Sequence, residues 1–198
     1  MKRDELRKMH EGIDRKFAAG LSKMLRTPVE VNLTNVWVLR YAEFTFGLDI
    51  PTCFNILQVE PLEGCMILDI AASIMNPMVN RLIGDGQEQC TLPQTYRTLT
   101  DIEVRLLSRI TNLFLAELKD AWKPVVELDF SVMKIECNLL LRQALPGNEN
   151  VVQLEFEVAL LGNRGHISLC IPFSFFEQIA EKLNTTVEEI KLLQNNIS

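Results

Sequence analysis

Apolar residues recur every three or four positions in the first stretch of the chain, which is the spacing of an amphipathic helix. The set comprises Leu6, Met9, Ile13, Phe17, Leu21 and Met24. We predict one continuous helix here, of roughly six turns, ended by Pro28. Val29, Val31 and Leu33 then alternate with polar residues, and this period of two predicts a half-buried strand that continues or bends through 36–40.

A hairpin and a second helix are predicted next. The segments 52–60 and 65–70 are rich in apolar and β-branched residues, and the Pro- and Gly-containing link between them favours a turn. A helical stripe of apolar residues then runs from Ile74 to Leu82 and ends at Gly84-Asp85-Gly86. Glycine there can adopt the positive φ of a helix C-cap.

A long helix is predicted after Thr100, because Thr100 and Glu103 form a capping box. It ends near Trp122, before Pro124. The residues expected to face inward are Ile102, Leu106, Ile110, Leu113 and Phe114.

The last part of the chain favours strands. Segment 125–136 predicts one or two strands, and 152–160 alternates strictly between apolar and polar residues. A tight turn at 162–165 leads to a return strand over 167–171, and Pro172 suits the start of a helix. A second capping box at Thr185 and Glu188 predicts a terminal helix.

The predicted order repeats. Each half contains a long helix, a strand, a hairpin and a short helix, and Thr27-Pro28-Val29 matches Lys123-Pro124-Val125. We therefore expect an α/β domain with pseudo-twofold symmetry and a central, mostly antiparallel sheet flanked by helices. The domain would cover 1–184, as two pseudo-repeats of about 1–86 and 99–184, followed by a C-terminal helix over 185–198.

Composition narrows the function classes. The net charge of −6 and pI of about 5.1, with no basic patch, argue against nucleic-acid binding. Five widely spaced cysteines without a Cys-x-x-Cys pair predict reduced thiols and no zinc site. No apolar run reaches the length of about 18 residues that a membrane helix needs, so we expect no membrane insertion.

The residues offer no catalytic constellation. His166 and Cys170 share a strand face but lie ~13 Å apart at strand rise, too far for a nucleophile and its base. His10 and His166 are expected to be structural. The glycines at 84–86 follow a helix rather than a strand, so they do not form a phosphate-binding loop. We expect no enzyme activity, no metal and no cofactor.

Short motifs in a specific order carry a family resemblance up to about Leu183. They are Thr27-Pro28-Val29-Glu30-Val31, Pro51-Thr52-Cys53, Val59-Glu60-Pro61-Leu62-Glu63-Gly64, Leu99-Thr100-Asp101-Ile102-Glu103, Ala121-Trp122-Lys123-Pro124-Val125, Ile135-Glu136-Cys137-Asn138, Phe156-Glu157-Val158 and Leu169-Cys170-Ile171-Pro172-Phe173. The chain resembles the middle domain of the flagellar motor switch protein family FliM, which has the CheC-like phosphatase fold.

The resemblance implies a non-catalytic adaptor of the flagellar motor switch complex, the C-ring. Its partners would be the FliG middle domain, neighbouring FliM subunits and phosphorylated CheY, whose binding is relayed into reversal of flagellar rotation in chemotaxis. FliN would bind through a C-terminal domain that we expect this chain to lack, as we expect it to lack the acidic N-terminal peptide that captures CheY. The implied location is cytoplasmic, at the flagellar basal body on the cytoplasmic face of the inner membrane.

The resemblance also implies a FliG-binding site. The family has a Gly-Gly-x-Gly loop, and this chain has Ile83-Gly84-Asp85-Gly86 in its place, so either Ile83 replaces the first glycine or one residue is missing. The residues expected to contact FliG are Asn80, Arg81, Ile83, Gly84, Asp85 and Gly86.

The alternative is a CheC-like phosphatase acting on phosphorylated CheY. The motif of that family is Asp or Ser, three residues, Glu, two residues, Asn. With Asn112 on the motif's Asn, Arg109 occupies the Glu position and Arg105 the first position. Two cations thus replace the acidic groups, and Asn112 is expected to pack rather than to catalyse. A third possibility, an α/β domain without these partners, does not account for the ordered motifs.

Overall fold

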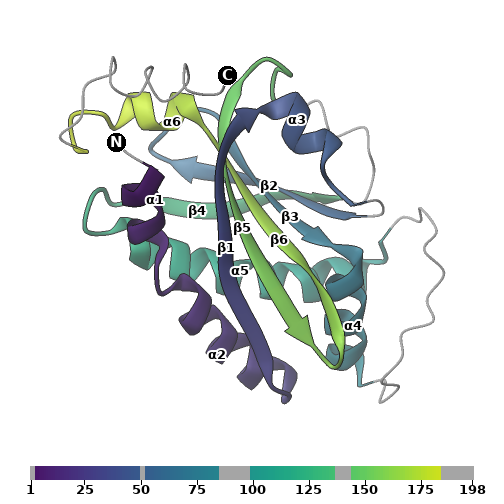
Figure 1. Cartoon of the computed structure of the whole chain (residues 1–198). Helices are drawn as coiled ribbons and strands as arrows, with labels where there is room; N and C mark the ends of the chain where they lie inside the picture. The colour runs from purple at the N-terminus through teal and green to yellow at the C-terminus, as the bar shows by residue number, and fades with distance from the viewer. Residues whose placement is uncertain (1–2, 50–51, 85–98, 137–143, 184–198) are drawn as a thin grey trace.

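Six strands form one antiparallel sheet in the order β1-β5-β6-β3-β2-β4 (Figure 1). The computed structural model describes residues 3–49, 52–84, 99–136 and 144–183. The strands are β1 (Val29–Arg40), β2 (Thr52–Glu60), β3 (Cys65–Ala71), β4 (Asp129–Glu136), β5 (Asn150–Leu160) and β6 (Asn163–Pro172). The helices are α1 (Arg3–His10), α2 (Ile13–Leu25), α3 (Tyr41–Phe46), α4 (Ala72–Ile83), α5 (Asp101–Trp122) and α6 (Phe173–Gln178).

The strand order has an internal twofold. Exchanging β1 with β4, β5 with β2 and β6 with β3 returns the same order reversed, so the axis passes between β6 and β3. The first strand of each half pairs with the hairpin of the other half: β1 with β5, and β4 with β2. The pseudo-symmetric α/β fold is therefore confirmed. The boundaries near 86 and 184 and the terminal helix over 185–198 lie outside the described residues and stay predictions.

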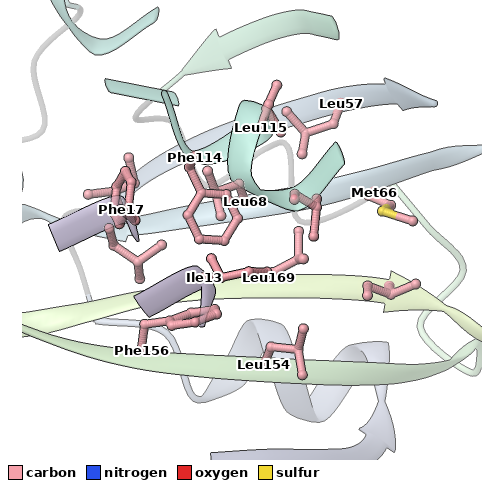
Figure 2. Packing of buried hydrophobic residues seen from close by; sticks show 14 of the residues in the cluster. Ile13, Phe17, Leu57, Met66, Leu68, Phe114, Leu115, Leu154, Phe156 and Leu169 are labelled. Carbon is pink, nitrogen blue, oxygen red and sulfur yellow. The ribbon is translucent and has the colours of Figure 1, made fainter. Parts of the chain in front are cut away.

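The main core lies between the sheet and the helices α2 and α5. Phe114 of α5 meets Phe17 of α2 and Phe156 of β5 edge to face, at ring-centroid distances of 5.2 and 5.4 Å, as Figure 2 shows. Gly20 permits the close approach of the helices, because a Cβ there would lie 2.9 Å from Leu113 Cδ1. Aromatic pairs in this geometry add stabilisation beyond the burial of their area.

A smaller apolar cluster covers part of the opposite face of the sheet. Successive strand residues point to opposite faces, so Ile67 and Cys170 face away from the helix layer that contacts Leu68 and Leu169. The buried members of this cluster are Tyr41, Phe44, Phe54, Ile67, Val151 and Cys170. They come from α3 and from the strands, so α3 covers the apolar residues on this second face of the sheet.

The prediction of one continuous N-terminal helix is wrong. The apolar spacing persists from Leu6 to Met24, but the chain breaks into α1 and α2 around Gly12. Gly12 has a φ of 98°, in the left-handed region that only glycine occupies without cost. The periodicity describes the buried face of both helices, and it does not reveal the change of direction between them.

The long helix α5 begins as predicted, with one error. Thr100 Oγ1 accepts from the Glu103 amide at 3.3 Å, and the Glu103 carboxylate accepts from the Thr100 amide at 2.8 Å. Glu103 is consequently buried, and Ile102 beside it is turned outward with 64% of its surface exposed, so the inward placement of Ile102 was wrong. The helix α3 was not predicted from the sequence at all. The amides of its first two residues, Tyr41 and Ala42, donate to the carbonyls of Glu149 and Gly147 in the loop before β5.

Candidate protein-interaction site

The proposed contact residues lie at the end of α4, where the helix stops at a glycine. Gly84 has a φ of 93°, and its N–H donates to the Asn80 carbonyl at 3.1 Å. This is the left-handed C-cap that the sequence predicted. Among residues 3–49, 52–84, 99–136 and 144–183, no heavy atom beyond its chain neighbour lies within 4 Å of a Cβ built on Gly84, so these residues leave the backbone at this end of the helix open.

Asn80 and Ile83 share one face of α4, since residues three apart on a helix are neighbours. Ile83 is 57% exposed, which makes it a large apolar side chain at the surface beside an accessible backbone. Asn80 is half-buried. The two remaining residues of the predicted site, Asp85 and Gly86, lie outside the described residues.

Arg81 points to a different neighbour. Its Nε donates to the Leu25 carbonyl at 3.0 Å and its Nη2 to the Arg26 carbonyl at 3.2 Å. These carbonyls belong to the last turn and C-cap of α2, which have no intrahelical partner. Arg81 therefore holds the end of α4 against the end of α2, and sequence reasoning missed this role because the two segments lie far apart in the chain.

The other end of α4 rests on the β5–β6 hairpin. A Cβ added to Gly165 would lie 2.2 Å from Ser73 Oγ and 3.0 Å from Ile74 Cγ2. Only glycine allows β6 to pass so close to the first turn of the helix. Contacts to two different elements, α2 and β6, thus fix α4 at both ends and set the direction in which Ile83 projects.

The positions aligned with the phosphatase motif form an exposed row on α5. Arg105, Arg109 and Asn112 follow the helical spacing of four and three residues, and all three are exposed. The expectation that Asn112 packs is wrong, because the next residue, Leu113, takes the inward position against Gly20. The row thus presents two guanidinium groups and one amide.

The two histidines differ in environment. His10 is fully buried, with Nδ1 2.8 Å from the Leu6 carbonyl and Nε2 3.2 Å from Trp122 Nε1, so its structural role is confirmed. Burial lowers the pKa of His10 to about 4. His166 is about half exposed on its side chain, and its Nδ1 lies 3.9 Å from Glu155 Oε1.

The cysteines resolved by the described part of the chain are free thiols. Cys53 and Cys170 are buried and Cys65 is half-buried. Burial raises the pKa of Cys65 and, more strongly, that of Cys170, so neither thiol is activated as a nucleophile. Cys90 and Cys137 lie outside the described residues.

Two further kinds of site are absent from the described ranges. Among residues 3–49, 52–84, 99–136 and 144–183, no three His, Cys, Asp or Glu side chains are grouped so that they could hold a metal ion. In the same ranges, no helix combines the length and the apolar character needed to cross a membrane.

Comparison with known proteins decides the family. The family profile described as "Flagellar motor switch protein FliM" matches residues 2–187. The chain belongs to the FliM family. FliM of Borreliella burgdorferi is 32% identical over 177 residues, which are 89% of this chain and 49% of the relative. The chain thus spans about half the length of that curated FliM protein.

Solved FliM structures share the fold. The FliM middle domain from H. pylori matches with a TM-score of 0.80 and 30% identity, covering 91% of this chain and 97% of that one. FliM in the FliG–FliM complex from H. pylori matches with a TM-score of 0.79 and 31% identity, covering 87% of this chain and 94% of that one. The chain therefore corresponds to a FliM middle domain.

Proposed function

We propose that this FliM-family domain is a non-catalytic adaptor of the flagellar motor switch complex and that it binds the FliG middle domain through the end of α4. The contact residues would be Asn80, Arg81, Ile83, Gly84, Asp85 and Gly86. The observation that carries the proposal is the exposed Ile83 beside the left-handed Gly84. The proposal is also supported by the similarity of this chain to the FliM chain of a FliG–FliM complex.

The geometry suits a protein contact. An exposed isoleucine at the rim of a helix end supplies an apolar anchor, and interfaces concentrate binding energy in a few such positions. Gly84 carries no side chain that would keep a partner's backbone away. Arg81 holds the end of α4 in place through its hydrogen bonds to the end of α2. Because this end is already ordered, less conformational entropy would be lost when FliG binds.

The wider assembly is part of the same proposal. The outer faces of α1 and α2 and of α5 would lie beside neighbouring FliM copies in the ring, and FliN would join through a further C-terminal domain. Phosphorylated CheY would bias the domain between two orientations. A ligand with unequal affinity for two states is sufficient for such a switch, and no covalent step is needed. The location would be cytoplasmic, at the basal body.

The row on α5 supports the non-catalytic assignment. A CheC-like phosphatase uses a carboxylate at the position of Arg109, and the exposed Arg105 and Arg109 bring positive charge instead. A phosphate-release assay with phosphorylated CheY and this domain separates the two functions. Release no faster than that of CheY alone agrees with an adaptor, and accelerated release would favour the phosphatase.

The proposed site is tested by substituting Ile83 with aspartate. The FliG middle domain should bind the I83D domain with an affinity weakened by about 1–3 kcal/mol, because the new carboxylate would be poorly solvated in the interface. Ile102 offers a matched control, since it is also an isoleucine at a helix end and is 64% exposed. The I102D domain should bind FliG as the unsubstituted domain does.

Both variants should unfold at urea concentrations close to that of the parent, because surface substitutions usually change stability by less than about 0.5 kcal/mol. Unchanged FliG affinity in I83D, or a loss that I102D shares equally, would remove the end of α4 from the interface.

A further inference from the structure

Trp122, the last residue of α5, lies between the N-terminal helix and the C-terminal helix of the described chain. Its ring is fully buried. One contact is with His10 of α1, at a centroid distance of 5.8 Å, and the other is with Phe176 of α6, at 6.0 Å. Figure 1 shows α1 and α6 at the same end of the molecule. A single side chain therefore touches both terminal helices.

The contact with α1 is a complete hydrogen-bond relay. Trp122 Nε1 can only donate, so His10 Nε2 accepts this bond at 3.2 Å. The other nitrogen, Nδ1, then carries the hydrogen and donates to the Leu6 carbonyl at 2.8 Å. Only the neutral ring can make both bonds. The bond to Leu6 lies within α1, so the bond from Trp122 is the one that depends on docking of α1.

Docking determines whether α1 is a helix at all. It has eight residues, and isolated helices shorter than about 12 residues are marginal in water. The break at Gly12 separates it from α2, so α2 does not extend it. Besides His10, the docking contacts of α1 include the buried Leu6, Met9, which packs against the main core, and Arg7, which donates to the Leu33 carbonyl at 3.1 Å and the Thr34 carbonyl at 3.3 Å.

The same reasoning applies to α6, which has six residues. Phe176 is fully buried and packs on Trp122 with an interplanar angle of 31° and on Phe173 with an angle of 66°. The indole is thus one part of the surface on which α6 packs, beside Gly64, which lies against Phe175, and Glu63, whose backbone is hydrogen-bonded to Gln178. Both terminal helices contact this one ring.

We propose that Trp122 couples the two terminal helices, so that docking of α1 stabilises α6 and docking of α6 stabilises α1. A partner or a pull that displaces α1 would release the indole from His10, and the freed ring would support Phe176 less well. Coupling between two sites is reciprocal by thermodynamic necessity. A signal would pass in this way between the two terminal helices, at one end of the molecule, without a rearrangement of the sheet.

The test measures amide hydrogen exchange of α1 and α6 in the whole chain at neutral pH. In the H10A variant, exchange should accelerate in α1 and also, by about threefold or more, in α6. In the F176L variant, exchange should accelerate in α6 and also in α1 by a similar factor. The centre of β3 and β6 should exchange at the parent rate in both variants.

Two controls separate coupling from general destabilisation. F44L weakens the cluster on the other face of the sheet, where Phe44 is buried, and should leave the exchange of α1 and α6 within about twofold of the parent. H10F keeps a ring but removes the acceptor of the Trp122 bond, so it gives a milder perturbation if H10A does not fold.

The double variant H10A/F176L decides the question. If the two helices are coupled, the factor by which amide exchange accelerates in the double variant should be smaller, by about threefold or more, than the product of the factors in the two single variants. Multiplicative effects, or an α6 that exchanges at the parent rate while α1 is open, would overturn the proposal. The FliG contact plays no part in this test.

Discussion

The buried His10 predicts a specific dependence of stability on pH. The pKa of an imidazole in an unfolded chain is about 6.5, and burial lowers that of His10 to about 4. Because the folded pKa is the lower one, the unfolded chain binds this proton more readily. The folded state is therefore destabilised as the pH falls below 6.5, and the loss is complete below about pH 4.

The magnitude follows from the difference between the two pKa values. Each pKa unit corresponds to about 1.4 kcal/mol, so the full cost of protonation is about 3 kcal/mol, of which about 2 kcal/mol has accumulated at pH 5. The structural cause is visible, since a charged ring carries a hydrogen on Nε2 and can no longer accept from Trp122. Protonation of His10 would also place an uncompensated charge in a fully buried site.

Urea unfolding at several pH values between 7 and 4.5 measures this effect. Carboxylates also titrate near the lower end, so the decisive quantity is the difference between the parent and the H10Q variant, which cannot be protonated in this range. The parent should lose about 2 kcal/mol more than H10Q between pH 7 and pH 5.

The only other histidine provides a background for the control. His166 is partly exposed, and the difference that H10Q makes in the parent should also be found when H10Q is introduced into H166Q. Equal slopes for the parent and H10Q would show that His10 is not buried in the neutral form, and the hydrogen-bond relay through Trp122 would then be wrong.

Two further predictions concern close contacts within the fold. Thr111 is buried and donates to Asn55 Oδ1 at 2.9 Å, so T111V should lower the free energy of unfolding by about 1–3 kcal/mol, whereas S108A on the same helix should cost less; equal losses in urea titrations would contradict this. G165A should destabilise the domain by about 1–3 kcal/mol, because its Cβ would meet Ser73 Oγ and Ile74. Part of this loss should be recovered in G165A/S73A, and calorimetry that finds no recovery would rule out the proposed clash with Ser73.

Local signals in the sequence predicted the elements that depend on neighbouring residues. The capping box at Thr100 and the glycine C-cap at Gly84 were located correctly because their partners lie within four residues. The alternation from Val152 to Leu160 predicted β5 for a similar reason: one face of the strand is uniformly apolar. The sequence predicted the repeat, but it did not predict that the first strand of each half pairs with the hairpin of the other half.

Features that depend on distant residues were not predicted. The helix α3 begins with amides that donate to carbonyls near residue 147, and nothing near Tyr41 in the sequence indicates this. Arg81 was assigned to the FliG contact by family position, and its hydrogen bonds to the end of α2 could not be derived from the pattern of α4. The role of Gly12 was hidden because the apolar spacing continues across the break.

The first strand of each half pairs with the hairpin of the other half, and this pairing constrains the order in which the domain can fold during synthesis. Strand β1 is made early, but Val29 pairs with Leu160 and Arg40 with Asn150. On the ribosome, where the chain is synthesised from the N-terminus at about 5–20 residues per second, β1 must wait for most of the chain before its partner emerges. During that interval its apolar face and its unpaired edge are available to other molecules. We therefore expect a nascent chain of this domain to expose this strand to chaperones until β5 has left the exit tunnel.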